Sequence, residues 1–130
     1  MRVLVVDDSA EFIRAVVVFL GTLRDVEFVG QALTGQHGLR MAETLEPDLV
    51  LVDWMMPGMS GPDSARAIKT LPHAPKVVLL SLLNGPELVR SHQRWHSALG
   101  KRDLFLDRPG DAAPVGATGL RGADLDHLPT

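Results

Sequence analysis

Short apolar runs alternate with longer mixed stretches along most of the chain, from residue 2 to about residue 107. In the first and third runs, the apolar residues 3–6 and 49–52 are consecutive rather than alternating with polar ones. This pattern is typical of strands that are buried on both faces of a sheet. It predicts five strands, over residues 2–6, 26–33, 48–52, 76–80 and 103–107.

The stretches between these runs carry helix start and stop signals. Ser9 is placed to cap a first helix, and Ser60 with Asp63 three positions later resembles a capping box. Pro47 ends the second helix, and Gly100 is suited to end the fourth. We expect helices over roughly residues 10–23, 35–46, 61–71 and 84–99.

Strands that alternate with helices predict right-handed βαβ units and therefore a parallel sheet. The expected fold is a doubly wound α/β sandwich with five strands. In such sheets, functional side chains gather at the carboxyl ends of the strands. Residues 110–130 differ, because they are rich in Gly, Pro and Ala and lack an apolar stripe of helical period. We expect one domain over residues 1–109 and an irregular tail, with the last helix of the fold missing or irregular.

Composition narrows the possible classes of function. The chain has 130 residues, no cysteine and a formal net charge of -3. Without cysteine there is no disulfide framework, thiolate metal site or Cys nucleophile, and without a basic excess we expect no direct binding to nucleic acid. No stretch approaches the ~20 apolar residues of a membrane helix, and two acids end the first apolar run too early for a signal peptide. We therefore expect a cytoplasmic protein without a membrane partner.

Polar residues follow several of the predicted strands. Asp7 and Asp8 end the first strand, Asp53 the third and Ser81 the fourth, while Arg108 follows the fifth. At ~5 Å and an effective dielectric near ~20, each pair of charged carboxylates repels by about 3 kcal/mol. A bound cation, a basic partner or raised pKa values must offset this repulsion. Oxygen ligands favour Mg²⁺, and a carboxylate beside Mg²⁺ can attack a phosphoryl donor.

Three segments of the chain carry a family resemblance: residues 3–9, 48–61 and 77–81. Together they resemble the receiver domain of bacterial two-component systems, which has a flavodoxin-like fold. The resemblance implies that Asp53 is the phosphoacceptor, charged by a histidine kinase or a phosphotransfer protein. It also implies a Mg²⁺ ion held by Asp8, Asp53 and the backbone carbonyl of Met55, with Asp7 bound directly or through water.

The resemblance assigns further roles. Ser81 would bind the phosphoryl oxygen, Phe105 would be the switch aromatic, and Arg108 would stabilise the phosphate. The domain would then be no enzyme beyond self-catalysed phosphoryl transfer and dephosphorylation, and a stand-alone domain of this kind would signal through a downstream protein partner.

The sequence departs from the family pattern at several positions. The family has Lys followed by Pro after the fifth strand, where this chain has Arg108 and Pro109, and Leu82 replaces a small residue. Met55 and Leu83 add apolar bulk at the expected entrance. These features favour an alternative, a pseudo-receiver that acts without phosphorylation as a dimerisation or interaction module. A third reading, a Mg²⁺-dependent phosphatase similar to haloacid dehalogenases, requires an Asp-x-Asp arrangement that the adjacent Asp7 and Asp8 do not provide.

The first predicted helix is apolar nearly all round over residues 15–20. A helix of this kind tends to be buried on every side. If the last helix is missing, part of the sheet beside it also needs cover. We therefore expect a homodimer or partner interface at the first helix.

Overall fold

A computed structural model describes residues 1–82 and 98–101, with residues 98–100 described by their backbone alone. Within this part of the chain lie three helices and five strands. In chain order they are β1 (Arg2–Val6), α1 (Ala10–Leu20), β2 (Glu27–Ala32), α2 (Gly35–Leu45), β3 (Leu49–Asp53), α3 (Gly61–Lys69), β4 (Lys76–Ser81) and β5 (Ala98–Gly100).

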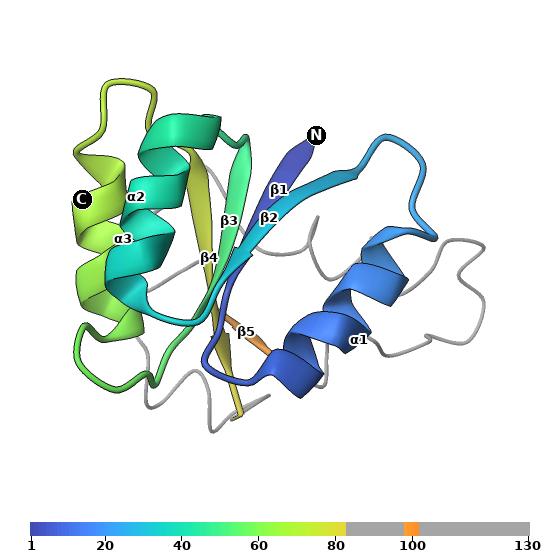
Figure 1. Ribbon diagram of the computed structural model, residues 1–130, viewed down its shortest axis with the longest axis horizontal. Coiled ribbons are helices and arrows are strands. Elements are labelled where there is room, and N and C mark those ends of the chain that lie inside the picture. The colour runs from blue at the N-terminus through green and yellow to red at the C-terminus, as the bar shows by residue number, and fades with distance from the viewer. Residues whose placement is uncertain (83–97, 102–130) are drawn as a thin grey trace.

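The strands form one parallel sheet in the order β2-β1-β3-β4-β5. Figure 1 shows α1 on one face of this sheet and α2 with α3 on the other, which is the doubly wound arrangement predicted from the sequence. Val6 pairs with Val52, Asp53 with Leu80, and Ser81 with Gly100. The carboxyl ends of β1, β3, β4 and β5 therefore lie along the same edge of the sheet.

The two faces of the sheet have separate apolar cores. On the α2 and α3 face, the strands contribute Leu4, Val6, Val50, Val52, Val77 and Leu79. On the α1 face, they contribute Val3, Val5, Leu49, Leu51, Val78 and Leu80. Successive residues of β1, β3 and β4 thus point to opposite cores, and this explains why the interiors of these three strands are continuously apolar.

Two of the predicted helix starts are confirmed. Ser9 Oγ accepts a hydrogen bond from the backbone N–H of Phe12 at 3.2 Å, and Ser60 Oγ accepts one from Asp63 at 3.2 Å. These caps satisfy backbone donors that the first turn of a helix leaves without partners. α1 is shorter than predicted, ending at Leu20 with Gly21 as its cap. The three described helices have at most 11 residues, and none is long and apolar enough to cross a membrane.

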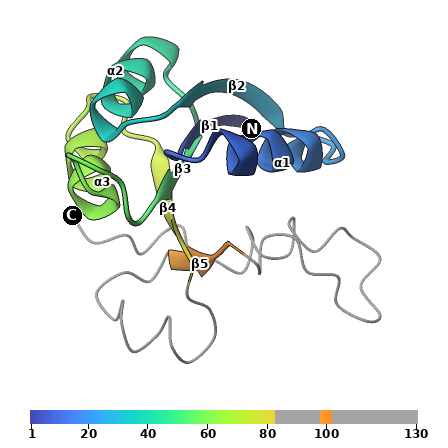
Figure 2. The same cartoon turned by 60° about the horizontal axis from the view of Figure 1, so that its bottom comes forward.

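The predicted extent of the fourth helix, to about residue 99, was wrong, because a strand beside β4 begins at Ala98. Residues 98 and 99, expected at the end of a helix, belong to β5, which pairs with Leu79–Ser81 of β4. The segment contains only one large apolar residue and no β-branched one, so it carries no local strand signal. Its conformation depends on pairing with β4, a contact between segments far apart in the sequence. Figure 2 shows β5 alongside the end of β4.

Several predictions lie outside the described residues. They are the body of the fourth helix, the segment 103–107, the domain boundary after residue 109 and the tail over residues 110–130. The expectation that the last helix is missing or irregular falls in the same region.

Candidate functional site

Three carboxylates meet at the carboxyl edge of the sheet. One oxygen from each of Asp7, Asp8 and Asp53 lies within 4.8 Å of the other two. Asp7 is fully buried and Asp53 is 6% exposed, while Asp8 is open to solvent. The backbone N–H of Asp7 donates to the Ala32 carbonyl at 3.0 Å, and Asp7 Oδ1 accepts from the N–H of Ser9 at 2.8 Å. These bonds hold the Asp7 carboxylate in place independently of its neighbours.

Lys101 places a cation between two of these acids. Its Nζ lies 2.8 Å from Asp7 Oδ2 and 3.3 Å from Asp53 Oδ1, and its side chain is 12% exposed. The backbone N–H of Lys101 donates to the Ser81 carbonyl at 2.6 Å, which continues the pairing of β5 with β4. A strand that was not predicted therefore delivers the basic residue of the site.

Sequence reasoning missed Lys101 because it placed the fifth strand after this residue. With β5 ending at Gly100, Lys101 is the residue that directly follows the fifth strand. This is the position at which the family resemblance calls for a lysine. Arg108, predicted for that role, and Phe105, predicted as the switch aromatic, lie outside the described residues.

The other predicted site residues lie near the same edge. Ser81 is the last residue of β4 and is 5% exposed. Met55 and Leu82 are highly exposed, at 78% and 79%. Both apolar side chains thus stand in solvent where the strand-end loops begin.

The environment of Asp53 favours its protonated form. Burial is the largest cause and the negative charge of Asp7 adds to it, so that the pKa of Asp53 rises from 3.8 to about 6. The Lys101 ammonium opposes this shift, because it stabilises the ionised carboxylate. Even with that cation in contact, ionised Asp53 remains disfavoured below pH 6.

The loop from Trp54 to Ser60 folds back tightly over the backbone of Asp53. The N–H of Trp54 donates to the Leu80 carbonyl at 2.7 Å, and the N–H of Gly61 donates to the Trp54 carbonyl at 3.0 Å. A Cβ at position 61 would overlap the carbonyl oxygen of Asp53, so only glycine fits there. The start of α3 is therefore packed directly on the residue that carries the central carboxylate.

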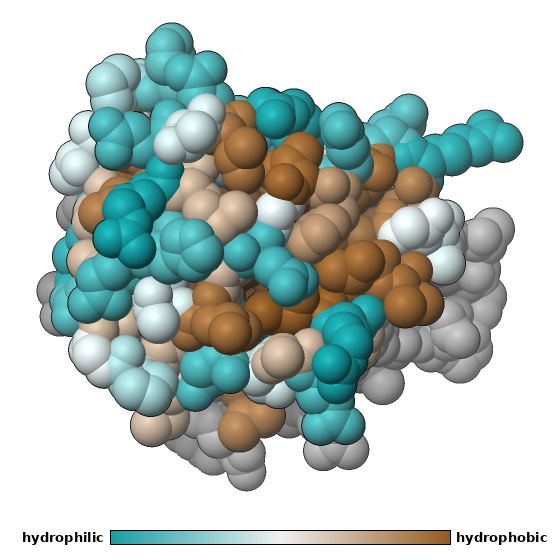
Figure 3. Space-filling model, in the orientation of Figure 1, coloured by the Kyte–Doolittle hydropathy of each residue, from teal (hydrophilic) through white to brown (hydrophobic). Residues whose placement is uncertain are grey.

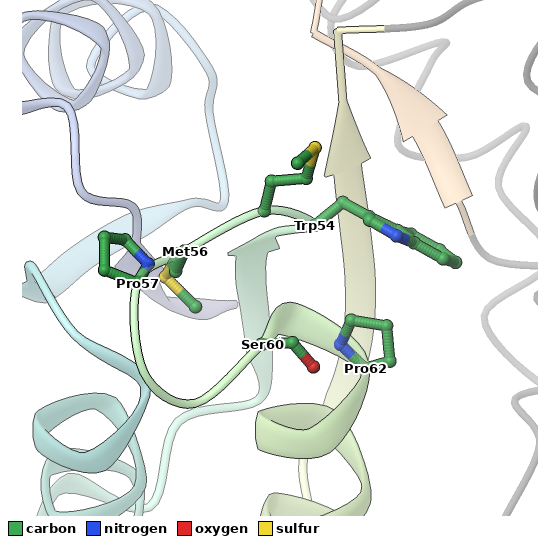
Figure 4. A pocket seen from close by; sticks show the side chains of 6 residues that line it. Trp54, Met56, Pro57, Ser60 and Pro62 are labelled. Atoms are coloured by element: carbon green, nitrogen blue, oxygen red, sulfur yellow. The ribbon is translucent and has the colours of Figure 1, made fainter.

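The same loop lines a pocket of about 500 Å³. Its lining residues are Trp54, Met55, Met56, Pro57, Ser60 and Pro62. Figure 4 shows Trp54 and Pro62 on the β4 side of the loop and Pro57 on the opposite side. None of these side chains is ionisable, so the pocket is chemically distinct from the acid cluster.

The acid cluster fits a hard divalent cation. Three carboxylates and one ammonium leave a charge of -2 when all are ionised. Asp7 Oδ2 is buried, and its ion pair with the Lys101 ammonium is its one contact with a polar group among the described residues. Oxygen ligands, spare negative charge and one solvent-open carboxylate match the preferences of Mg²⁺, which retains part of its hydration shell.

Comparison with known proteins identifies the family. The model of the response regulator receiver domain matches residues 3–93, which is more than half of the chain. The chain belongs to the response regulator receiver domain family. As a receiver domain it is a part of two-component signalling, as the resemblance in its sequence predicted.

Curated relatives match this receiver over part of their length. The chain is 38% identical over 82 residues to protein-glutamate methylesterase/protein-glutamine glutaminase 4 of Hahella chejuensis, covering 63% of this chain and 21% of the relative. It is 35% identical over 81 residues to the transcriptional regulatory protein LiaR of Bacillus subtilis, covering 62% of this chain and 38% of that protein. The chain thus spans well under half of either relative.

Solved structures agree on the fold. The signal receiver domain of the response regulator NarL from Mycobacterium tuberculosis has a TM-score of 0.70 at 29% identity, with 94% of each chain covered. The response regulator domain of Thermotoga maritima CheB has a TM-score of 0.66 at 26% identity, covering 99% of this chain and 98% of that one. The flavodoxin-like receiver fold expected from the sequence is confirmed.

The raised pKa of Asp53 predicts how stability depends on pH without divalent cations. Because the folded pKa of about 6 exceeds the ordinary 3.8, protonated Asp53 stabilises the fold below pH 4, and this contribution is lost as pH rises through 6. We expect Asp53→Asn to stabilise the protein at pH 8 by roughly 1–3 kcal/mol. The gain should shrink toward pH 4.5, as measured by urea unfolding in EDTA.

The exposed Asp63 provides a matched control for this experiment. Asp63→Asn makes the same chemical change in a carboxyl group that is 62% exposed and paired with Arg66 on the surface. Its effect on the free energy of unfolding should be small and should not rise between pH 4.5 and pH 8. If the effect of Asp53→Asn does not depend on pH, the loss of stability does not come from the ionisation of Asp53.

Proposed function

We propose that this receiver accepts a phosphoryl group on Asp53 in the presence of Mg²⁺ and signals through protein contacts. The observation that carries the proposal is the Lys101 ammonium between Asp7 Oδ2 and Asp53 Oδ1, at 2.8 and 3.3 Å. A cation in this position offsets charge on Asp53 and on any phosphoryl group joined to it. A purely structural acid cluster does not require a lysine at its centre.

The reaction joins a carboxylate oxygen of Asp53 to phosphorus. With a histidine kinase or phosphotransfer protein as donor, the P–N bond of the phosphohistidine breaks, and its electron pair returns to the imidazole, which is protonated by solvent. With a small acyl phosphate, the P–O bond breaks and the carboxylate leaves. The pKa of Asp53 near 6 leaves its carboxylate mostly ionised at pH 7.5, and thus nucleophilic.

The remaining residues of the site have proposed roles in the same step. Mg²⁺ would be held by Asp7, Asp8, Asp53 and the Met55 carbonyl, and when bound it lowers the repulsion between the carboxylate and the anionic donor. Lys101 would neutralise an oxygen of the transferred phosphoryl group. Ser81, at the end of β4, would donate its hydroxyl hydrogen to another. Phe105 remains the proposed switch aromatic, and Arg108 remains a second candidate for the cation.

A pseudo-receiver that acts without phosphorylation is the second candidate function. Met55 and Leu82 favour it, because two apolar side chains that are 78% and 79% exposed suit a protein contact better than a solvated entrance. The lysine at the position where the family expects one favours phosphorylation instead. The two candidates differ in whether Asp53 ever carries phosphate.

Phosphate uptake distinguishes these candidates. We expect wild type incubated with acetyl phosphate and Mg²⁺ to gain the mass of one phosphoryl group, because Asp53 is ionised and neighboured by Lys101. Asp53→Asn should gain none, whereas the surface control Asp63→Asn should behave as wild type. Intact-mass spectrometry provides the measurement. Wild type that stays unmodified would favour the pseudo-receiver.

A second comparison tests which cation serves the site. Lys101→Met should lower the rate of phosphorylation by about 10–100-fold, since it removes the charge beside the transferred group. Arg108→Met should change the rate less than about twofold, because in this proposal Lys101 supplies that charge. A time course by intact mass gives both rates. The reverse ranking would assign the role to Arg108, as the sequence alone suggested.

A homodimer through α1 is the proposed oligomeric arrangement. Ile13, Val16 and Leu20 are buried against the sheet, so the helix is less open than its composition suggested, but Val18 on its outer side is 72% exposed. Figure 3 shows apolar surface gathered over the region of α1. This outer face is what supports the proposal.

Sedimentation velocity tests the proposed dimer. Val18 is the one large apolar residue of α1 that is highly exposed, so we expect a contact below the ~1,200–2,000 Å² of a stable interface, with association only at micromolar concentrations. Val18→Glu should shift the protein toward monomer, because it buries a charge at the contact, while Glu11→Gln should not. A wild type that is monomeric across this range would rule out the dimer.

A further inference from the structure

The Lys101 ammonium has a third described neighbour that belongs to no motif of the family resemblance. Besides Asp7 and Asp53, Nζ lies 4.4 Å from the centre of the Phe12 ring. This separation is within the ~6 Å over which a cation is attracted to an aromatic face. The three neighbours come from the end of β1, the end of β3 and the first turn of α1. Lys101 is therefore held by groups on three separate elements.

The ring of Phe12 is tied to the acid cluster through Ser9. The N–H of Ser9 donates to Asp7 Oδ1 at 2.8 Å, and Ser9 Oγ accepts from the N–H of Phe12 at 3.2 Å. The N–H of Ile13 donates to the Ser9 carbonyl at 3.1 Å, which fixes the first turn of α1. The position of the ring is consequently coupled to that of the Asp7 carboxylate.

A ring attracts the ammonium in a different way from a carboxylate. It carries no net charge, so it leaves the positive charge of Lys101 available to an arriving phosphoryl oxygen. It is also not a ligand of Mg²⁺, so it would still contact Lys101 when Asp7 and Asp53 hold that ion. A lysine side chain is long and flexible, and restricting it costs conformational entropy that a fixed neighbour can help to offset.

We propose that Phe12 is a positioning residue for phosphoryl transfer, and that it acts by holding the Lys101 ammonium against the face of its ring. This inference rests on the proposed phosphorylation of Asp53 and deepens it, because it gives α1 a part in the reaction. Phe12 touches neither Mg²⁺ nor the phosphoryl group in this scheme. Its whole effect passes through Lys101.

Two substitutions separate the ring face from simple packing. Phe12→Leu keeps an apolar side chain but removes the aromatic face, whereas Phe12→Tyr retains that face. With acetyl phosphate and Mg²⁺ in the full chain, Phe12→Leu should lower the maximal rate by about 3–10-fold. The acetyl phosphate concentration at half-maximal rate should change less than about twofold, and Phe12→Tyr should stay near wild type. Ile13→Val, in the same helix turn, controls for lost packing.

A double-mutant cycle tests whether the effect passes through Lys101. In the Lys101→Met background, Phe12→Leu should cause no further loss of rate, because the cation that it positions is absent. An equal loss in both backgrounds would overturn the inference. So would a Phe12→Leu variant that is phosphorylated at the full wild-type rate.

These results remain distinct from a failure of the proposed function. A wild type that gains no phosphate overturns the proposed function and this inference together. A wild type that is phosphorylated normally, alongside an unaffected Phe12→Leu variant, overturns the inference alone. Proton NMR adds an independent readout: the Lys101 ε-methylene signals should be shifted upfield by the ring in wild type, and this shift should be lost in Phe12→Leu.

Discussion

The parallel register of β1 and β3 brings three carboxylates within 4.8 Å of one another, and the chemistry of the site follows from their mutual repulsion. Burial strengthens that repulsion, because little water reaches Asp7 or Asp53 to screen their charges. Lys101 offsets part of it and leaves the cluster still negative. The result is a site with a raised pKa at Asp53 and an excess of negative charge that suits a divalent cation.

Most of the sheet could be predicted from the sequence because its signals are local. The interiors of β1, β3 and β4 are continuous apolar runs, as expected for strands that are covered on both faces. Ser9 and Ser60 were recognisable as caps because each hydroxyl serves a backbone donor only three residues away. The acids were placed correctly for the same reason, since each directly ends or follows such a run.

The location of β5, and with it the role of Lys101, could not be predicted in this way. Three residues, two of them Ala98 and Gly100, take strand geometry because β4 offers them hydrogen-bond partners. Residues 103–107 carry a stronger local strand signal, and Gly100 carries a helix-stop signal, so sequence reasoning placed the fifth strand after Gly100. Because β5 ends at Gly100, the residue that follows the fifth strand is Lys101, as the family pattern requires, and not Arg108. The departure that remains at this point is Arg102 where the family has Pro.

The close approach of Gly61 to the backbone of Asp53 has a consequence for how this domain can vary. Position 61 carries no functional group, yet any side chain there would push the carbonyl of Asp53 and the strand end behind it. Substitutions at this glycine would therefore impair the site as the loss of a functional side chain does, although no functional group is removed. Which substitutions the site tolerates is thus set by backbone contact as much as by charge. A change in the position of the start of α3 requires a matching change in the position of Asp53.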